Sequence, residues 1–361
     1  MSTDFIPLVD LEPWFVGTDD DRLMLAETVD AHLRRCGFLV VVNHGIDPTV
    51  FERMRTTATD FFHQPPSAKE LVMPDGGGLY RGWIGPGRES NAATYGIDTP
   101  PDLKETFAFG TIEDLPAQTR ATSPELYADN LWPDDPASFR SIAETYWTAC
   151  RRLADDLLEL FALALGLDRN EIVDHCQETT ATGNVNWYWP HRHGAAEPGQ
   201  YRIGPHTDFG TITILDRQPG LGGLQVKDDD DRWIDAPVVD GSLIVNTGDM
   251  LRQWTNDRWC SNEHRVLPPS PDAPEEELIS LVFFHEPDAD AVIEPFPTCV
   301  SAAVPARYEP ILAKDYLAEK FAALEVGSSA DRRRRHRAAA GRAGDRDRTD
   351  GDDRCDDEGR R

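Results

Sequence analysis

The segment IGPHTDFGTITIL, residues 203 to 215, contains a histidine and an aspartate one residue apart, followed by alternating threonine and isoleucine. Residues two apart in an extended strand face the same side, so His206 and Asp208 can present an imidazole nitrogen and a carboxylate oxygen to one ion. Ile212 and Ile214 have the same parity and are expected to face a barrel interior, with Thr211 and Thr213 facing away. The pattern predicts two metal ligands at the open end of an apolar tube.

A third ligand is needed, because two protein ligands hold a labile metal poorly. His264 in NEHRVL lies in a second strand candidate, and the 55 residues between Asp208 and His264 leave room for about four strands. Two histidines and one carboxylate on one face of a metal are the arrangement of non-haem Fe(II) oxygenases, which leave positions open for substrate and O2. Zinc is the rival ion, since the same ligand types hold catalytic zinc.

The strands that must position these ligands are visible from residue 183 to 290, where apolar residues alternate with a period of two. Gly-, Pro- and Asp-rich turns separate the strand candidates NVNWYW, TITIL, GLQVK, RWIDAP, SLIVNTG, EHRVL and LISLVFFHE. Many short strands with turns at regular spacing indicate an antiparallel sandwich or barrel such as a jelly roll.

Helical periodicity is found on both sides of this region. Residues 21–36 form an amphipathic helix that Gly37 is expected to end, and residues 48–65 form a second. The longest helix is expected from Phe139 to Leu165, with Asp135 and Pro136 as its cap and first turn and Gly166 as its stop. Further expectations are a long loop at 77–101 and a last helix at 310–324.

These patterns divide the chain into consecutive regions. We expect an N-terminal α/β leader region, a spine helix, a jelly roll, a C-terminal helix and a disordered tail, at residues 1–120, 121–180, 181–300, 301–327 and 328–361. The tail is rich in arginine and acids and contains no Leu, Ile, Val, Phe, Tyr or Trp. It cannot bury enough apolar surface to offset the entropy of ordering.

Composition limits the possible partners. The formal net charge of -28 argues against nucleic acid, whose phosphates require a basic surface. No stretch approaches the ~20 apolar residues of a membrane span. Six scattered cysteines without a CxxC pair suit reduced thiols, and the N-terminus carries no signal core, so a cytoplasmic protein is expected. The expected partners are a small molecule and O2, and the sequence does not indicate the oligomeric state.

The motifs PHTDFGTITIL, GLGGLQV, NTGDML and SNEHRVLPP, in this order, resemble the isopenicillin N synthase-like family of Fe(II)- and mostly 2-oxoglutarate-dependent dioxygenases. IPLVDL, CGFLVVVNHGI, YRGWIG and DLKETFAFG resemble the leader domain of that family, so the likeness covers roughly residues 5 to 325. The resemblance implies a double-stranded β-helix with flanking helices and iron at one mouth. By motif match, His206, Asp208 and His264 are the iron ligands.

The resemblance also implies a cosubstrate site. The family binds 2-oxoglutarate through an Arg-x-Ser pair, but here Ser280 is preceded by Leu278 in place of the arginine. Leucine cannot offset the cost of burying a carboxylate, so either another cation reaches the site or the cosubstrate differs. Of two candidates, Arg217 is favoured over Arg265, whose parity points it away from the metal. The remaining cosubstrate residues by motif match are Asn186, Tyr188 and Asn246.

The leading hypothesis is an oxygenase that uses Fe(II), 2-oxoglutarate and O2 to oxidise a small molecule, with release of succinate and CO2. One alternative is an Fe(II) oxidase of the same fold that does not use 2-oxoglutarate, either isopenicillin N synthase-like or ethylene-forming. Another is a non-catalytic metal-binding protein. The residues expected to line the substrate pocket are Trp83, Arg88, Trp187, Arg192 and Phe283.

Overall fold

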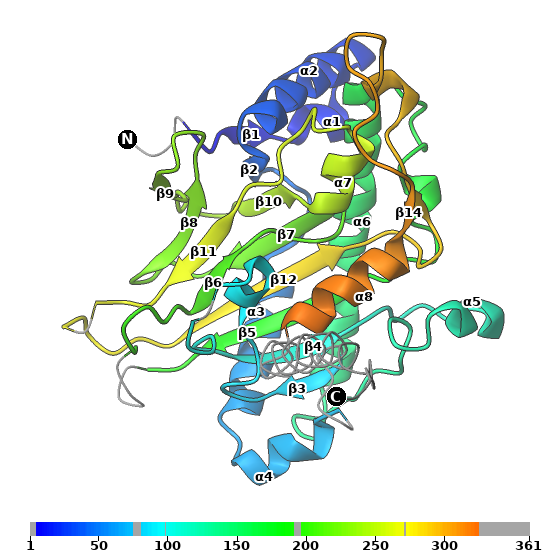
Figure 1. Ribbon diagram of the computed structural model, residues 1–361. Coiled ribbons are helices and arrows are strands. Elements are labelled where there is room, and N and C mark those ends of the chain that lie inside the picture. Colours follow the sequence, from blue (N-terminus) through cyan, green and yellow to red (C-terminus); the bar gives the residue numbers. More distant parts are fainter. Residues whose placement is uncertain (1–4, 75–80, 98, 191–195, 271, 325–361) are drawn as a thin grey trace, which may run out of the picture.

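The computed structural model describes most of the chain, namely residues 5–74, 81–97, 99–190, 196–270 and 272–324. The expected tail at 328–361 and the pocket candidate Arg192 lie outside the described residues. Within them, two sheets face each other and helices cover the outer side of the larger one (Figure 1).

The larger sheet contains eight strands in the described residues, and neighbouring strands are antiparallel except for the first pair. Their order across the sheet is β1 (Leu8–Asp10), β2 (Phe38–Val42), β10 (Leu243–Thr247), β7 (Ile212–Arg217), β12 (Leu278–His285), β5 (Thr182–Tyr188), β4 (Glu105–Phe109) and β3 (Gly82–Ile84). The leader region therefore supplies strands to both edges of the jelly roll.

The smaller sheet contains four strands and carries both histidine ligands of the predicted metal site. Its order is β6 (Ile203–His206), β11 (His264–Leu267), β8 (Gly223–Lys227) and β9 (Trp233–Asp235). A separate pair is formed by β13 (Val292–Ile293) and β14 (Ile311–Leu312). This is the expected mostly β double-stranded β-helix, and each of the seven strand candidates forms a strand.

The four expected helices form close to their expected bounds, and the described residues contain four more. The helices are α1 (Glu12–Val16), α2 (Asp19–Cys36), α3 (Pro48–Phe62), α4 (Pro66–Lys69), α5 (Ala117–Thr122), α6 (Phe139–Leu165), α7 (Asp249–Trp254) and α8 (Ala313–Leu324), with short 3-10 turns η1 (Glu70–Val72), η3 (Asn91–Tyr95), η4 (Val173–His175) and η6 (Pro297–Cys299). Gly37 and Gly166 end α2 and α6 in the left-handed conformation that favours glycine.

Two local expectations were wrong. Helix α6 has Ser138 rather than Asp135 at its N-cap, and the peptide bond between Asp135 and Pro136 is cis and precedes the helix. The segment 77–101 is not one continuous loop, because its described part contains β3 and η3. β3 pairs with β4 and so extends the large sheet.

The two faces of the large sheet differ in chemistry. On the outer face, Ile212, Ile214, Leu281 and Phe283 are buried in the main apolar core, which also contains Trp147 of α6. Helices α3 and α6 lie on this face (Figure 1). The inner face is more polar and looks toward the small sheet. The jelly roll therefore keeps its metal-binding mouth on the side of this sheet away from α3 and α6.

This arrangement corrects the expected parity of the HxD strand. Ile212 and Ile214 face the helices and Thr213 faces the barrel interior, the reverse of the expectation. The reason is that β6 ends at His206 and β7 begins at Ile212. Residues 207–211 cross from the small sheet to the large one, so the alternation of β6 does not continue into β7.

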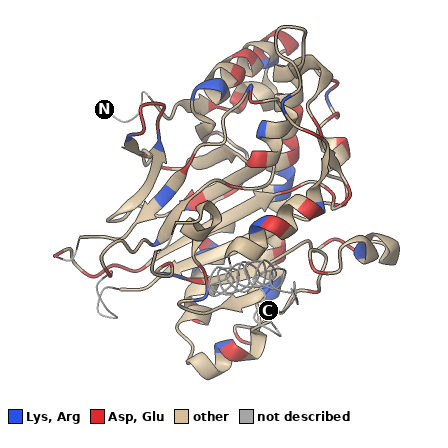
Figure 2. Ribbon diagram, viewed as in Figure 1, with Lys and Arg blue, Asp and Glu red and all other residues tan. Residues whose placement is uncertain are grey.

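Acidic residues are numerous, with 64 Asp and Glu in the chain. They are spread over the helices and loops, with Lys and Arg among them (Figure 2). None of the helices in the described ranges is both long and apolar enough to cross a membrane.

Candidate metal and cosubstrate site

Three potential ligands meet at the mouth of the barrel. His206 ends β6 and His264 begins β11, and the two are direct partners in the pairing of these strands. Their ring centroids are 4.2 Å apart. Asp208 lies in the crossover just after β6, and its Oδ1 is 3.6 Å from the Nε2 atom of each histidine. All three side chains are buried.

The donor set fits one Fe(II) ion. Two ligand atoms about 2.1 Å from an ion and at right angles are roughly 3 Å apart, so shifts of a few tenths of an ångström close the site. Two imidazoles and a carboxylate on one side of an ion leave its other positions open. This facial arrangement is typical of non-haem Fe(II) oxygenases.

Each histidine is oriented through its other ring nitrogen. Nδ1–H of His206 donates to the carbonyl of Gly204 at 2.8 Å, and Nδ1–H of His264 donates to the carbonyl of Asn262 at 3.1 Å. Both Nε2 atoms are thereby left as the metal-binding atoms. Burial lowers the pKa of His206 to about 4, with His264 contributing, so this imidazole is neutral at physiological pH.

The carboxylate of Asp208 is held from the large sheet. Its Oδ2 accepts hydrogen bonds from Thr213 of β7 at 2.5 Å and from Asn246 of β10 at 2.6 Å. Burial raises the pKa of Asp208, but the neighbouring histidines and these two donors outweigh it, and the pKa is lowered overall. Oδ1 is left to face the histidines as an ionised ligand.

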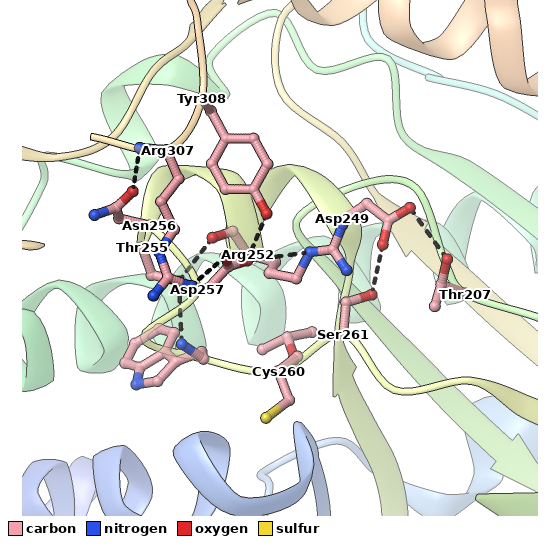
Figure 3. A network of polar contacts seen from close by, with 12 residues as sticks. Thr207, Asp249, Arg252, Thr255, Asn256, Asp257, Cys260, Ser261, Arg307 and Tyr308 are labelled. Atoms are coloured by element: carbon pink, nitrogen blue, oxygen red, sulfur yellow. Dashed lines mark hydrogen bonds and ion pairs between the residues drawn. The ribbon is translucent and has the colours of Figure 1, made fainter. Parts of the chain in front are cut away.

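Asp249, the first residue of α7, connects the segments around the ligands. Its backbone N–H donates to the carbonyl of Asp208 at 2.8 Å. Its carboxylate accepts from Thr207 at 3.1 Å and from Ser261 at 2.8 Å (Figure 3). On the α8 side, the Tyr316 hydroxyl at 2.7 Å and the Lys320 ammonium at 3.2 Å donate to the same carboxylate. One buried carboxylate thus fixes the loop between two ligands and the approach to the third.

A cavity extends from the metal ligands between the two sheets. Tyr188, Ser280 and Arg217 lie side by side on its large-sheet wall, because Ser280 pairs with Arg217 across β12 and β7. The Tyr188 and Ser280 hydroxyls are 3.2 Å apart. Leu278 also lines the cavity, opposite Tyr188 in the strand pairing. Asn186 and Asn246 complete the set of expected cosubstrate residues in this cavity.

Two arginines reach this cavity, and they differ in their partners. Arg202 forms an ion pair with Glu276 at 3.1 Å and lies over the Tyr188 ring. Arg217 forms no ion pair within the described residues, and its Nη2 donates to the carbonyls of Ala236 and Pro237 at 2.6 and 2.7 Å. Burial lowers the pKa of Arg217, although the charge of Asp235, which also lines the cavity, opposes the shift. Arg217 is therefore the cation left to meet an anion.

The remaining arginine candidate and two pocket candidates lie elsewhere. Arg265 bonds to Gln225 and stacks on Trp233, away from the metal as parity predicted. Phe283 faces the outer helices and meets Trp147 edge-on, so the expectation that it lines the pocket is corrected. Trp187 is likewise on the outer face, where it stacks on Phe62 and lines a separate hollow. Both corrections follow from strand parity.

Trp83 and Arg88 do not line this cavity either. Trp83 is buried and its indole N–H donates to Glu105 at 2.7 Å. Arg88 contacts the sulfur of Met73 at 3.5 Å. Arg192 lies outside the described residues.

Several site residues escaped sequence reasoning. Thr213 was assigned to the wrong face, although the alternation in TITIL contained the signal. Asp249 lies in the motif NTGDML, but a single sequence does not show whether such an aspartate is a helix cap or a buried carboxylate that hydrogen-bonds to neighbouring segments. Arg202 gave no local signal because strand pairing brings it to the cavity.

Comparisons with known proteins agree with this geometry. Residues 6–135 match the family described as non-haem dioxygenase in morphine synthesis N-terminal, and residues 179–287 match the 2OG-Fe(II) oxygenase superfamily. Validamycin A dioxygenase of Streptomyces hygroscopicus subsp. limoneus is 39% identical over 303 residues, covering 81% of this chain and 80% of the relative. Homoarginine-6-hydroxylase 2-ODD-233 of Oryza sativa subsp. japonica is 30% identical over 339 residues, covering 89% and 98%.

Solved structures give the same result. A full-length Neurospora crassa protein, solved in complex with alpha-KG, aligns with a TM-score of 0.75 and 29% identity, covering 88% of this chain and 96% of that chain. The two family matches together span more than half of the chain. The chain belongs to the 2-oxoglutarate- and Fe(II)-dependent oxygenase superfamily.

Proposed function

We propose that His206, Asp208 and His264 hold the Fe(II) of this dioxygenase, and that the adjoining cavity takes 2-oxoglutarate. The observation that carries the proposal is the approach of Asp208 Oδ1 to both imidazole Nε2 atoms at 3.6 Å. Fe(II) with 2-oxoglutarate and O2 supplies the oxidation of a bound small molecule, releasing succinate and CO2. The protein holds the reactants in place and excludes water from a buried site.

Arg217, Ser280 and Tyr188 are proposed to bind the distal carboxylate of 2-oxoglutarate. A guanidinium suits this task because it donates two parallel hydrogen bonds to a carboxylate. The two carbonyl contacts of Arg217 fix its plane before the cosubstrate arrives. Burial raises the pKa of Tyr188, which keeps its hydroxyl protonated and able to donate. Arg217 would thus take the role of the family's arginine, whose position is occupied here by Leu278.

The competing interpretation, an Fe(II) oxidase without 2-oxoglutarate, rests on Leu278 alone. The cation at Arg217 removes the need for it, since a buried positive charge already faces the cavity. The names of the relatives, which refer to validamycin A and homoarginine, support a small-molecule substrate for this chain. A cytoplasmic location stays a prediction.

The test is spectroscopic and then chemical. Fe(II) and 2-oxoglutarate are added to the purified chain without oxygen, and the metal-to-ligand charge-transfer absorption is recorded. O2 is then admitted and succinate is measured. The proposal expects the absorption and succinate together. Oxygen uptake without succinate would favour the oxidase, and iron binding without oxygen uptake would indicate a non-catalytic protein.

A further inference from the structure

A second cavity reaches two of the three proposed metal ligands, His206 and Asp208. It shares His206, Asp208 and Asn186 with the cosubstrate cavity, and its outer wall is formed by Phe321 and Leu324 of α8. It reaches these ligands and does not have Arg217 in its lining, which suits the molecule that is oxidised rather than the cosubstrate. The chemistry of its walls therefore indicates the class of substrate.

The walls carry one positive charge that is already neutralised. Lys104 is buried and pairs with Glu89, and its ammonium also donates to Thr106 at 2.7 Å. Lys104 lies 3.4 Å from the side-chain oxygen of Asn186. This cation is saturated by the protein itself, so an anionic substrate gains little from it.

Glu286 has no such partner. Its side chain lines the cavity and the residue is 4% exposed, yet no ion pair to it forms among the described residues. The one hydrogen bond that its carboxyl receives in the described part of the chain comes from the Thr180 hydroxyl at a long 3.5 Å. Burial raises the pKa of Glu286 to about 8, even though the more distant charge of Arg81 opposes the rise. A cation bound beside this carboxyl would favour its ionised form.

The same wall contains a second acceptor without a donor. Oδ1 of Asn184 is buried and has no hydrogen-bond partner in the described residues, and Asn184 lines the cavity on the inner face of β5. A buried acceptor left without a donor is unfavourable, so a ligand that donates to it gains affinity. The hydroxyl of Thr182 lies on the same face, two residues along the strand. This wall therefore presents hydrogen-bond acceptors that lack donors from the described part of the protein.

We propose that this cavity binds a small substrate that carries a protonated amine and further hydroxyl or N–H donors, with Glu286 as the counter-ion of the amine and Asn184 as an acceptor. Phe209, Phe284 and Phe321 supply aromatic wall on which the apolar part of such a molecule, or its cation, can rest. The inference rests on the proposed function, because it takes the metal ligands as the point where the two cavities meet.

The experiment uses matched pairs of probes that differ in one amine. Glucosamine is compared with glucose, and 6-aminohexanoate with 6-hydroxyhexanoate, on the full chain loaded anaerobically with Fe(II) and 2-oxoglutarate. Binding is measured by calorimetry and by the change that each probe causes in the charge-transfer absorption. We expect at least one amine to bind 10-fold or more tighter than its neutral partner, as expected for a charge-assisted hydrogen bond. Which pair responds distinguishes a sugar-like from an amino-acid-like amine.

The variant Glu286→Gln keeps the shape of the side chain and removes its charge. It should reduce the preference for the amine to within about 2-fold, while Fe(II) and 2-oxoglutarate still give the absorption. Glu144→Gln, on the exposed side of α6, is the matched control and should keep the wild-type preference. Equal binding of amines and neutral partners across both pairs would overturn the inference, as would a preference that survives in Glu286→Gln. Absence of the absorption in the wild type would instead refute the proposed function.

Discussion

Replacing Arg217 by methionine should weaken 2-oxoglutarate binding strongly. Methionine keeps the apolar stem and removes the guanidinium that lies beside Ser280 on the cavity wall. A hydrogen bond to a charged group contributes about 1.5–3 kcal/mol, and part of a paired contact is lost in reorganisation. A loss of about 2–4 kcal/mol corresponds to a dissociation constant raised roughly 30- to 1000-fold at 25 °C. Iron binding should change little, because the metal ligands belong to other segments.

The assay is an anaerobic titration of 2-oxoglutarate into the Fe(II)-loaded protein, followed by the charge-transfer absorption. Arg265→Met is the matched control, since Arg265 stacks on Trp233 outside the cavity, and it should bind as the wild type does. In the Arg217→Met background, Leu278→Arg should recover much of the affinity by restoring an arginine at the position that family members use. A change of less than 3-fold in a folded Arg217→Met protein would refute the reasoning and direct attention to Arg202.

The other predictions concern the metal site and its supports. His264→Ala should abolish the charge-transfer absorption and retain no iron in metal analysis after desalting. Asn246→Ala removes a donor to Asp208 and should lower iron affinity about 10- to 100-fold in a competition with a chelator. Asp249→Asn replaces a carboxylate oxygen by an NH2 group that cannot accept the hydrogen bonds that Asp249 receives. This variant should have a lower melting temperature and a lower iron affinity. The pKa of Glu286 is raised from 4.5 to about 8 in the folded protein, because burial disfavours the charged carboxylate. Its contribution to the free energy of unfolding is therefore fully present below pH 4.5 and is lost as pH rises through 8. Glu286→Gln should therefore raise the melting temperature of the metal-free protein more at pH 9 than at pH 5.

The elements could be predicted because their signals are local. The stripe of α6 from Phe139 and its stop at Gly166 are a long helical period with a glycine end, and the short strands alternate over their whole length. The segment of β6 was expected to continue into β7 as one strand, because four residues containing a proline, Ile203–His206, carry too little periodicity to show where a strand ends. The extended conformation of β6 is stabilised instead by its pairing with β11.

The grouping of His206, Asp208 and His264 as a candidate metal site could be predicted from residue types and spacing, whereas the walls of the cavities could not. The parity argument failed where the chain changes sheet between His206 and Ile212, since alternation holds only within one strand. Phe283 and Trp187 were expected in the pocket, but one residue of register decides which face of the sheet they occupy. Glu286 was overlooked for a different reason: a single sequence does not show whether a carboxyl is paired.

The way the three ligands are divided between the sheets has a mechanical consequence. Both histidines belong to adjacent strands of the small sheet, while the aspartate is gripped by Thr213 and Asn246 of the large one. An ion bound by all three residues would link the two sheets at the open rim of the barrel, where β6 and β7 are not joined by backbone hydrogen bonds. Removing the metal should therefore destabilise this rim more than the part of the large sheet that α3 and α6 cover. The rate of amide hydrogen exchange should rise first in residues 207–211.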